Sequence, residues 1–88
     1  MNITFDPTKD AANQAKHGLS LASAAAIEWE TVWCWPDLRQ MYGEPRQVGI
    51  GYIGLRLHCV VFTDRGGERR IISLRKANAR EVARYAQA

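Results

Sequence analysis

The stretch RQVGIGYIGLRLHCVVFTDRGGERRIISLRK, residues 46–76, contains three successive runs rich in alternating apolar residues. The runs cover residues 46–52, 55–63 and 69–75, and turns containing glycine separate them at residues 53–54 and 64–67. A period of two is typical of β-strands, and short glycine turns join neighbouring antiparallel strands. The stretch therefore predicts an antiparallel meander at the centre of the fold.

The segment that begins the chain predicts a short strand followed by a helix. Residues 3–5 alternate between apolar and polar, which indicates a strand. Asp6-Pro7 favours a helix start, because Asp accepts hydrogen bonds from free amides and Pro fits the first helical position. The expected helix covers about residues 7–16 and ends at His17-Gly18, where glycine permits a left-handed backbone.

The next segment predicts a second helix and a further strand. Ser20 is a suitable cap for a helix over about residues 21–29, which would complete a helical hairpin packed on the sheet. Residues 31–35, Thr-Val-Trp-Cys-Trp, are rich in strand-forming types, and Pro36 is expected to end that strand.

The end of the chain predicts a C-terminal helix. Asn78 and Glu81 have the spacing of a capping box, in which each side chain bonds to the backbone of the other residue. We expect Val82, Tyr85 and Ala86 to face the core. The predicted fold class is α+β: an N-terminal strand and a helical hairpin packed on an antiparallel sheet of about four strands, with a C-terminal helix.

Composition bounds the class of protein. The chain has 88 residues, of which 47% are hydrophobic and 24% charged, and this balance indicates a single globular domain over residues 1–88. No apolar run approaches the ~20 residues that cross a bilayer, and the start of the chain lacks the pattern of a secretory signal. We therefore expect a cytoplasmic protein with no membrane partner.

Charge is distributed unevenly along the chain. Residues 1–44 hold three basic and six acidic residues, whereas residues 45–88 hold nine basic and three acidic residues. Nine of the twelve basic residues are Arg, whose planar guanidinium suits phosphate. The basic half favours an anionic partner such as nucleic acid, although a solvated basic face that aids solubility explains the charge equally well.

The chemistry-bearing residues favour metal-independent cleavage of RNA. Two Cys and two His are present, but His58 and Cys59 are neighbours on a strand and point to opposite faces, so we expect no metal and no cofactor. No glycine-rich phosphate loop or nucleophile elbow is present. Arg and Lys suit stabilisation of a charged phosphorus intermediate formed by the 2′-hydroxyl, and His or Glu suit proton exchange.

Four motifs keep the order and spacing of a known family over nearly the whole chain. They are Phe5-Asp6…Lys9…Asn13…Lys16-His17-Gly18-Leu19-Ser20, Gly43-Glu44-Pro45-Arg46, Arg70-Ile71-Ile72-Ser73-Leu74-Arg75-Lys76-Ala77 and Glu81…Tyr85. With these motifs the chain resembles the BrnT family of type II toxin–antitoxin toxins. The resemblance implies a RelE-like fold, ribonuclease activity that halts translation, and neutralisation by an antitoxin called BrnA. It also implies operator DNA binding through the antitoxin complex, and a toxin dimer within a heterotetramer is compatible with it.

Five residues are candidates for the catalytic site: His17, Glu44, Arg46, Arg75 and Lys76. His17 suits proton transfer, and the alternative is a residue at a helix end that the helix dipole favours. Glu44 and Arg46 suit a base and a phosphate clamp, or simply an ion pair. Arg75 and Lys76 are adjacent cations at a strand end, where a bound anion would relieve their repulsion.

Five further residues are candidates for RNA binding: Lys16, Arg56, Arg69, Arg70 and Tyr85. Lys16 suits either phosphate binding or capping of the helix end. Tyr85 suits stacking on a base, but its place in the apolar stripe of the last helix favours core packing. Trp33 and Trp35 share one strand face, where they serve either the core or a docking surface for a partner.

Two other classes of function stay open. A nucleic-acid-binding module without catalysis, such as a degenerate toxin that acts only as a co-repressor, would use the same basic half. A purely structural interaction protein would use the tryptophan strand and the basic face to recognise a partner chain.

Overall fold

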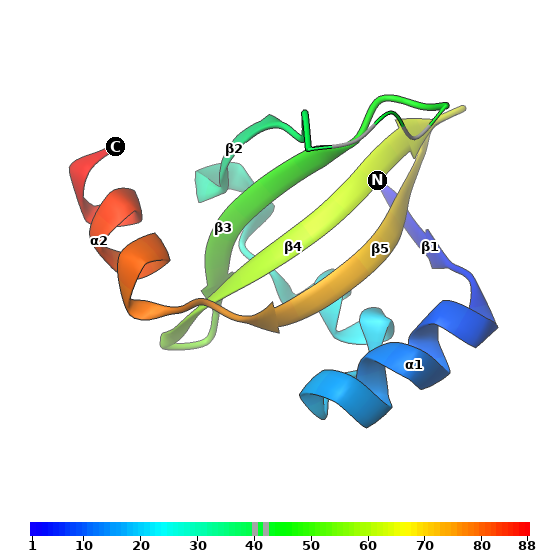
Figure 1. The fold of residues 1–88 in the computed structure, drawn as a ribbon, viewed down its shortest axis with the longest axis horizontal. Helices are drawn as coiled ribbons and strands as arrows, with labels where there is room; N and C mark the ends of the chain where they lie inside the picture. The colour runs from blue at the N-terminus through cyan, green and yellow to red at the C-terminus, as the bar shows by residue number, and fades with distance from the viewer. Residues whose placement is uncertain (40, 42) are drawn as a thin grey trace.

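The computed structural model describes residues 1–39, 41 and 43–88, which form a five-stranded sheet with helical segments on both faces (Figure 1). The strands lie side by side in the order β1-β5-β4-β3-β2. Their bounds are β1 Asn2–Phe5, β2 Trp33–Pro36, β3 Gln47–Ile53, β4 Arg56–Arg65 and β5 Glu68–Lys76. The helical segments are α1 Pro7–His17, η1 Leu21–Ala26, η2 Trp29–Thr31 and α2 Ala79–Gln87.

The predicted meander of β3, β4 and β5 is confirmed: β3 pairs antiparallel with β4, and β4 pairs antiparallel with β5. The expected number of about four strands is too low, because short strands cover both edges of the meander. β2 pairs antiparallel with β3, and β1 pairs parallel with β5, with Phe5 opposite Ile71. Each added strand has four residues and satisfies backbone groups that the meander alone would leave unpaired.

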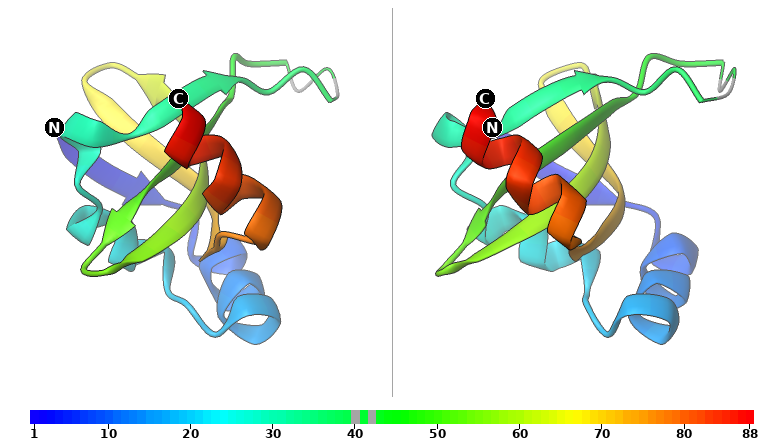
Figure 2. Two further views of the ribbon diagram at one scale, coloured as in Figure 1. Left: turned by 90° about the vertical axis from the view of Figure 1, so that its left-hand side faces the viewer. Right: turned by 60° about the vertical axis from the view of Figure 1, so that its left-hand side comes forward.

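Alternation along the strands gives the sheet two packed faces, seen from two directions in Figure 2. The η1 face carries the larger core, in which strand residues pack against the segment after α1: Leu21, Ala24, Ile27, Val60, Phe62, Ile71 and Leu74. The α2 face carries two smaller cores, one around Val48, Cys59 and Val61 and one around Ile50, Leu57 and Ala77. The second α2-face core lies against α2 through Tyr85, whereas the first is open to the groove described below.

Local signals define α1 as the sequence predicts. The Asp6 carboxylate accepts a hydrogen bond of 2.8 Å from the Thr8 amide, and Gly18 ends the helix with φ of 71°. Asn13 is buried on the inner side of the helix, and its side-chain amide donates to the carbonyls of Leu19 and Leu74 and accepts from the Leu74 amide. These three bonds fix α1 against β5.

The expected second α-helix over residues 21–29 is wrong. The chain instead forms two 3₁₀ segments, η1 and η2, separated by an extended backbone at Ile27. After Ile27 the Glu28 amide donates to the Tyr52 carbonyl of β3. Val32 then packs so closely on β3 that a Cβ at Gly51 would lie 2.7 Å from its side chain. These contacts hold the segment on the glycine surface of β3, and a regular helix would not follow that path.

The capping box of α2 is confirmed, with Asn78 and Glu81 bonded to each other's backbone amides at 2.9 Å. Tyr85 packs on Tyr52 and donates to the Thr31 carbonyl. The expectation that Val82 and Ala86 face the core is wrong, because both are exposed. Within α2, Glu81 and Tyr85 are half-buried and the other residues are exposed. Among the described residues, no helix has the length and apolar character needed to span a membrane.

Candidate active site

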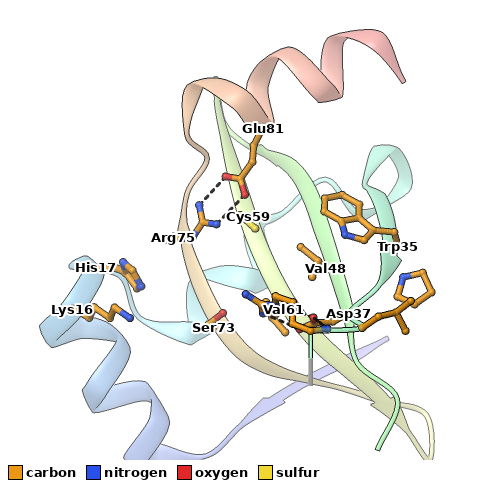
Figure 3. A pocket seen from close by; sticks show the side chains of 13 residues that line it. Lys16, His17, Trp35, Asp37, Val48, Cys59, Val61, Ser73, Arg75 and Glu81 are labelled. Atoms are coloured by element: carbon orange, nitrogen blue, oxygen red, sulfur yellow. Dashed lines mark hydrogen bonds and ion pairs between the residues drawn. The ribbon is translucent and has the colours of Figure 1, made fainter. Parts of the chain in front are cut away.

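A groove of about 630 Å³ lies on the α2 face, between the end of α1, the residues after β2 and the start of α2 (Figure 3). Its floor consists of strand residues from β3, β4 and β5, and its rim carries most of the charge. The lining residues are Lys16, His17, Trp35, Pro36, Asp37, Leu38, Arg39, Val48, Cys59, Val61, Ser73, Arg75 and Glu81. Segments that are far apart in the sequence therefore meet around one cavity.

The end of α1 brings two candidate residues to this groove. Lys16 and His17 follow Asn13 by three and four residues, so all three lie on the same side of the helix. The bonds from Asn13 to Leu74 thereby place Lys16 and His17 next to the outer part of β5. Figure 3 shows both side chains on the side of the groove near Ser73 and Arg75.

Arg75 lies on β5 and lines the groove, and Glu81 of α2 holds its guanidinium. The two terminal nitrogens of Arg75 donate to the two carboxylate oxygens of Glu81 at 2.7 and 2.8 Å. Hydrogen bonding from Arg75 lowers the pKa of the Glu81 carboxyl from 4.5 to about 2. A carboxylate that is held ionised orients the arginine and is a poor base at neutral pH.

The opposite wall carries a second arginine held by a carboxylate. Arg39 donates from Nε and Nη2 to the two oxygens of Asp37, both at 2.8 Å. The Asp37 side chain is 1% exposed, whereas that of Arg39 is 70% exposed. Sequence reasoning missed Asp37, Arg39 and Glu81 as groove residues. The capping box did locate Glu81, but nothing local indicated its contact with Arg75.

The floor of the groove is apolar and its thiol is unreactive. Burial raises the pKa of the Cys59 thiol from 9.0 to about 11, so the sulfur stays protonated at neutral pH. Trp35 forms one wall, and its ring lies 5.1 Å from that of Trp33. Arg84 of α2 stacks over both rings, at 4.6 and 5.1 Å from their centroids. The tryptophan pair therefore packs against α2, and only Trp35 reaches the groove.

Other candidate residues lie away from the groove. Lys76 pairs in register with His58, whereas Arg75 pairs with Cys59, so the two adjacent cations point to opposite faces. Arg56 lies at the start of β4 opposite Ile53 and is exposed. Tyr85 is half-buried in the core beneath α2.

Arg69 and Arg70 occupy opposite faces of β5. Arg69 forms two hydrogen bonds with Asp64, at 2.7 and 2.9 Å, and covers the rings of Trp29 and Phe62 on the η1 face. Arg70 pairs in register with Thr63, two residues beyond the groove residue Val61, so it lies on the α2 face beyond the groove lining.

Glu44 and Arg46 lie beside the groove rather than in it. Glu44 contacts Arg46 at 3.5 Å and Arg65 at 3.0 Å. Both Glu44 and Arg46 line a neighbouring depression, which shares residues 36–38 with the groove. Of the ten candidates from the sequence, the groove brings together Lys16, His17 and Arg75.

Potential metal ligands are dispersed over the described part of the chain. Cys34 is exposed and Cys59 is buried, and both are free thiols. Within residues 1–39, 41 and 43–88, no three His, Cys, Asp or Glu side chains are grouped so that they could hold a metal ion.

Comparisons with known proteins match this arrangement to one family. The family model described as the ribonuclease toxin, BrnT, of type II toxin–antitoxin systems matches residues 5–81. Among solved structures, the chain resembles the ribonuclease toxin BrnT of Brucella abortus, with 30% identity and a TM-score of 0.69. That match covers 89% of this chain and 97% of the Brucella chain. No curated protein sequence matches this chain. Because the family model spans most of its length, the chain belongs to the BrnT family of ribonuclease toxins of type II toxin–antitoxin systems.

Proposed function

We propose that this protein is an endoribonuclease that cleaves RNA in the groove without a metal ion and thereby inhibits translation. The single observation that supports this proposal most is the meeting of Arg75, Lys16 and His17 at one cavity. Arg75 and Lys16 are basic side chains that suit phosphate, and His17 carries an imidazole, which suits proton exchange. We also infer that the fold is RelE-like, on the basis of family membership.

The proposed reaction is attack by the ribose 2′-hydroxyl on the adjacent phosphorus. A bond forms between the 2′-oxygen and the phosphorus, and the bond between the phosphorus and the departing 5′-oxygen breaks. The 2′-hydroxyl proton passes to a base, and the 5′-oxygen receives a proton from an acid. The products are therefore a 2′,3′-cyclic phosphate and a 5′-hydroxyl end.

The groove residues suit distinct parts of this reaction. We assign Arg75, which lines the groove, to binding the phosphate oxygens, where charge accumulates as the phosphorus becomes five-coordinate. Lys16 adds a second positive charge, and His17 is the group we assign to proton transfer. Because Glu81 has a pKa of about 2, we assign it to positioning Arg75.

A toxin of this class is paired with an antitoxin. We propose a BrnA-type antitoxin that neutralises the protein, with operator DNA contacted through the antitoxin in a complex that contains a toxin dimer. Because the proposed substrate is RNA used in translation, we also propose that the protein acts in the cytoplasm.

The test is cleavage by purified, antitoxin-free protein in EDTA. We expect cellular RNA to be degraded in EDTA as rapidly as in magnesium, and the products to carry cyclic phosphate ends. RNA that stays intact while circular dichroism shows folded protein would exclude the nuclease and favour the non-catalytic binding module. Cleavage that disappears in EDTA would exclude the metal-independent reaction.

A further inference from the structure

Arg39 on the wall opposite Arg75 is held in a defined orientation by its neighbour Asp37. The Asp37 carboxylate accepts from the Arg39 backbone amide at 3.2 Å as well as from two nitrogens of its guanidinium. The backbone of Asp37 is itself fixed, because its amide donates to the Arg46 carbonyl at 2.8 Å and continues the pairing of β2 with β3. The orientation of Arg39 is therefore fixed relative to the sheet.

This arrangement places a buried carboxylate behind an exposed cation. The Asp37 side chain is 1% exposed and that of Arg39 is 70% exposed, so the charge of the arginine faces solvent at the groove. A guanidinium held at two points loses less conformational entropy when it binds a second anion, which favours a binding role.

The groove repeats the same construction on both sides. Arg75 is held at two points by Glu81, just as Arg39 is held by Asp37. Hydrogen bonding to Glu81 raises the pKa of the Arg75 guanidinium, whereas burial and the positive charge of Arg39 act against it. The two arginines therefore interact through their charges across the groove, and an anionic strand between them would relieve that repulsion.

We propose that Arg39 binds a backbone phosphate of the RNA strand adjacent to the phosphate held by Arg75, and that Asp37 positions its guanidinium. This inference rests on the proposed function for the identity of the strand as RNA. It adds a second phosphate-binding position to the groove and assigns a role to the residues that follow β2.

The experiment measures binding of a 2′-O-methyl RNA oligonucleotide, which lacks the attacking hydroxyl and is not cleaved. Equilibrium binding is measured over a range of salt concentrations for the wild type, for Arg39→Ala, Arg39→Lys and Asp37→Asn, and for the double variant with Arg39→Ala and Asp37→Asn. The matched control is Arg65→Ala, which removes the same charge from a side chain that is 69% exposed and also paired with a carboxylate, but lies outside the groove.

We expect Arg39→Ala to lower affinity by about tenfold and to reduce the salt slope by about 0.7, the value for one phosphate contact to a single strand. Arg39→Lys is expected to keep most of the slope and to lose part of the affinity. Arg65→Ala is expected to match the wild type. Asp37→Asn should weaken binding in the wild-type background but have no further effect in the Arg39→Ala background, which a general loss of stability would not produce.

The inference is overturned if Arg39→Ala binds with wild-type affinity and salt slope, or if Arg65→Ala has an equal effect. It is also overturned if the wild type fails to bind the oligonucleotide. If Asp37→Asn does not fold, the comparison of Arg39→Ala, Arg39→Lys and Arg65→Ala decides alone. A wild type that binds through Arg39 but does not cleave unmodified RNA would exclude the proposed nuclease and leave this binding position intact.

Discussion

The Glu81 carboxylate accepts two hydrogen bonds, of 2.7 and 2.8 Å, from the guanidinium of Arg75. The same carboxylate accepts from the Asn78 amide and so caps α2. One side chain therefore connects the start of the C-terminal helix to an arginine that lines the groove. The proposed reaction needs a phosphate in this groove, and the contact with Glu81 fixes where Arg75 points before substrate arrives.

The first prediction concerns this contact and acid stability. The pKa of Glu81 is lowered from 4.5 to about 2, so its stabilising effect is complete above about pH 4.5 and is lost as the pH falls toward about 2. We expect Glu81→Gln to lower the free energy of unfolding near neutrality and to lose less on acidification than the wild type. Urea unfolding at several pH values measures this difference. Equal pH dependence of the two proteins would contradict it; Asp64, whose pKa is also lowered, is common to both.

The second prediction separates two adjacent cations of β5. Arg75 faces the groove and Lys76 faces the opposite side of the sheet. We expect Arg75→Ala to reduce the cleavage rate by about 10²-fold or more, in the range seen when a group that stabilises transition-state charge is removed. The loss from Lys76→Ala should be at least about tenfold smaller. Initial rates of RNA cleavage test the pair, and equal losses would show that the groove assignment is wrong.

The third prediction concerns proton transfer at the end of α1. Removing the imidazole by His17→Ala should lower kcat by about 10²–10⁴-fold, as expected for loss of a general acid or base. Lys16→Ala, one residue earlier, should act mainly on KM, because we assign Lys16 to phosphate binding. Steady-state kinetics on a cleavable oligonucleotide separate the two effects. A His17→Ala protein with wild-type kcat would remove His17 from the proposed reaction.

The fourth prediction concerns Asn13, which carries no part of the chemistry but holds α1 on β5. Asn13→Ala removes three hydrogen bonds and leaves the buried Leu74 amide and carbonyl without these partners. We expect a loss of about 1–3 kcal/mol in the free energy of unfolding. Thermal and urea unfolding measure it, and Gln14→Ala on the exposed side of the same helix is the control. Equal stability of the two variants would mean that these bonds do not anchor α1.

Local sequence signals predicted those parts of the fold that depend on neighbouring residues. The alternation in residues 46–76, the Asp6 cap, the end of α1 at Gly18 and the capping box of α2 were all readable and are confirmed. The 3₁₀ course of residues 21–31 was not readable, because the contact of Val32 with the glycines of β3 determines it. The parallel pairing of β1 with β5 likewise depends on an edge that exists only in the folded sheet.

The sequence also predicted some of the residues that line the groove and missed others. The family resemblance is confirmed, and the motifs that carry it include the groove residues Lys16, His17 and Arg75. Asp37 and Arg39 were missed because the pairing of β2 with β3 brings the residues after β2 to the groove, and no local sequence signal indicates that pairing. Lys76 and Arg75 point to opposite faces of the sheet because side chains alternate along a strand, and that signal was available in the sequence.

We propose that groups around one groove cleave a single phosphodiester by attack of the adjacent ribose 2′-hydroxyl. The most direct measurement maps a cleavage site in an RNA oligonucleotide in EDTA and then replaces only the ribose at that site with 2′-deoxyribose. We expect a 2′,3′-cyclic phosphate from the unmodified strand and no cut at the substituted position. Cleavage that persists at the deoxy position, or an unmodified strand left intact by folded protein, would contradict it.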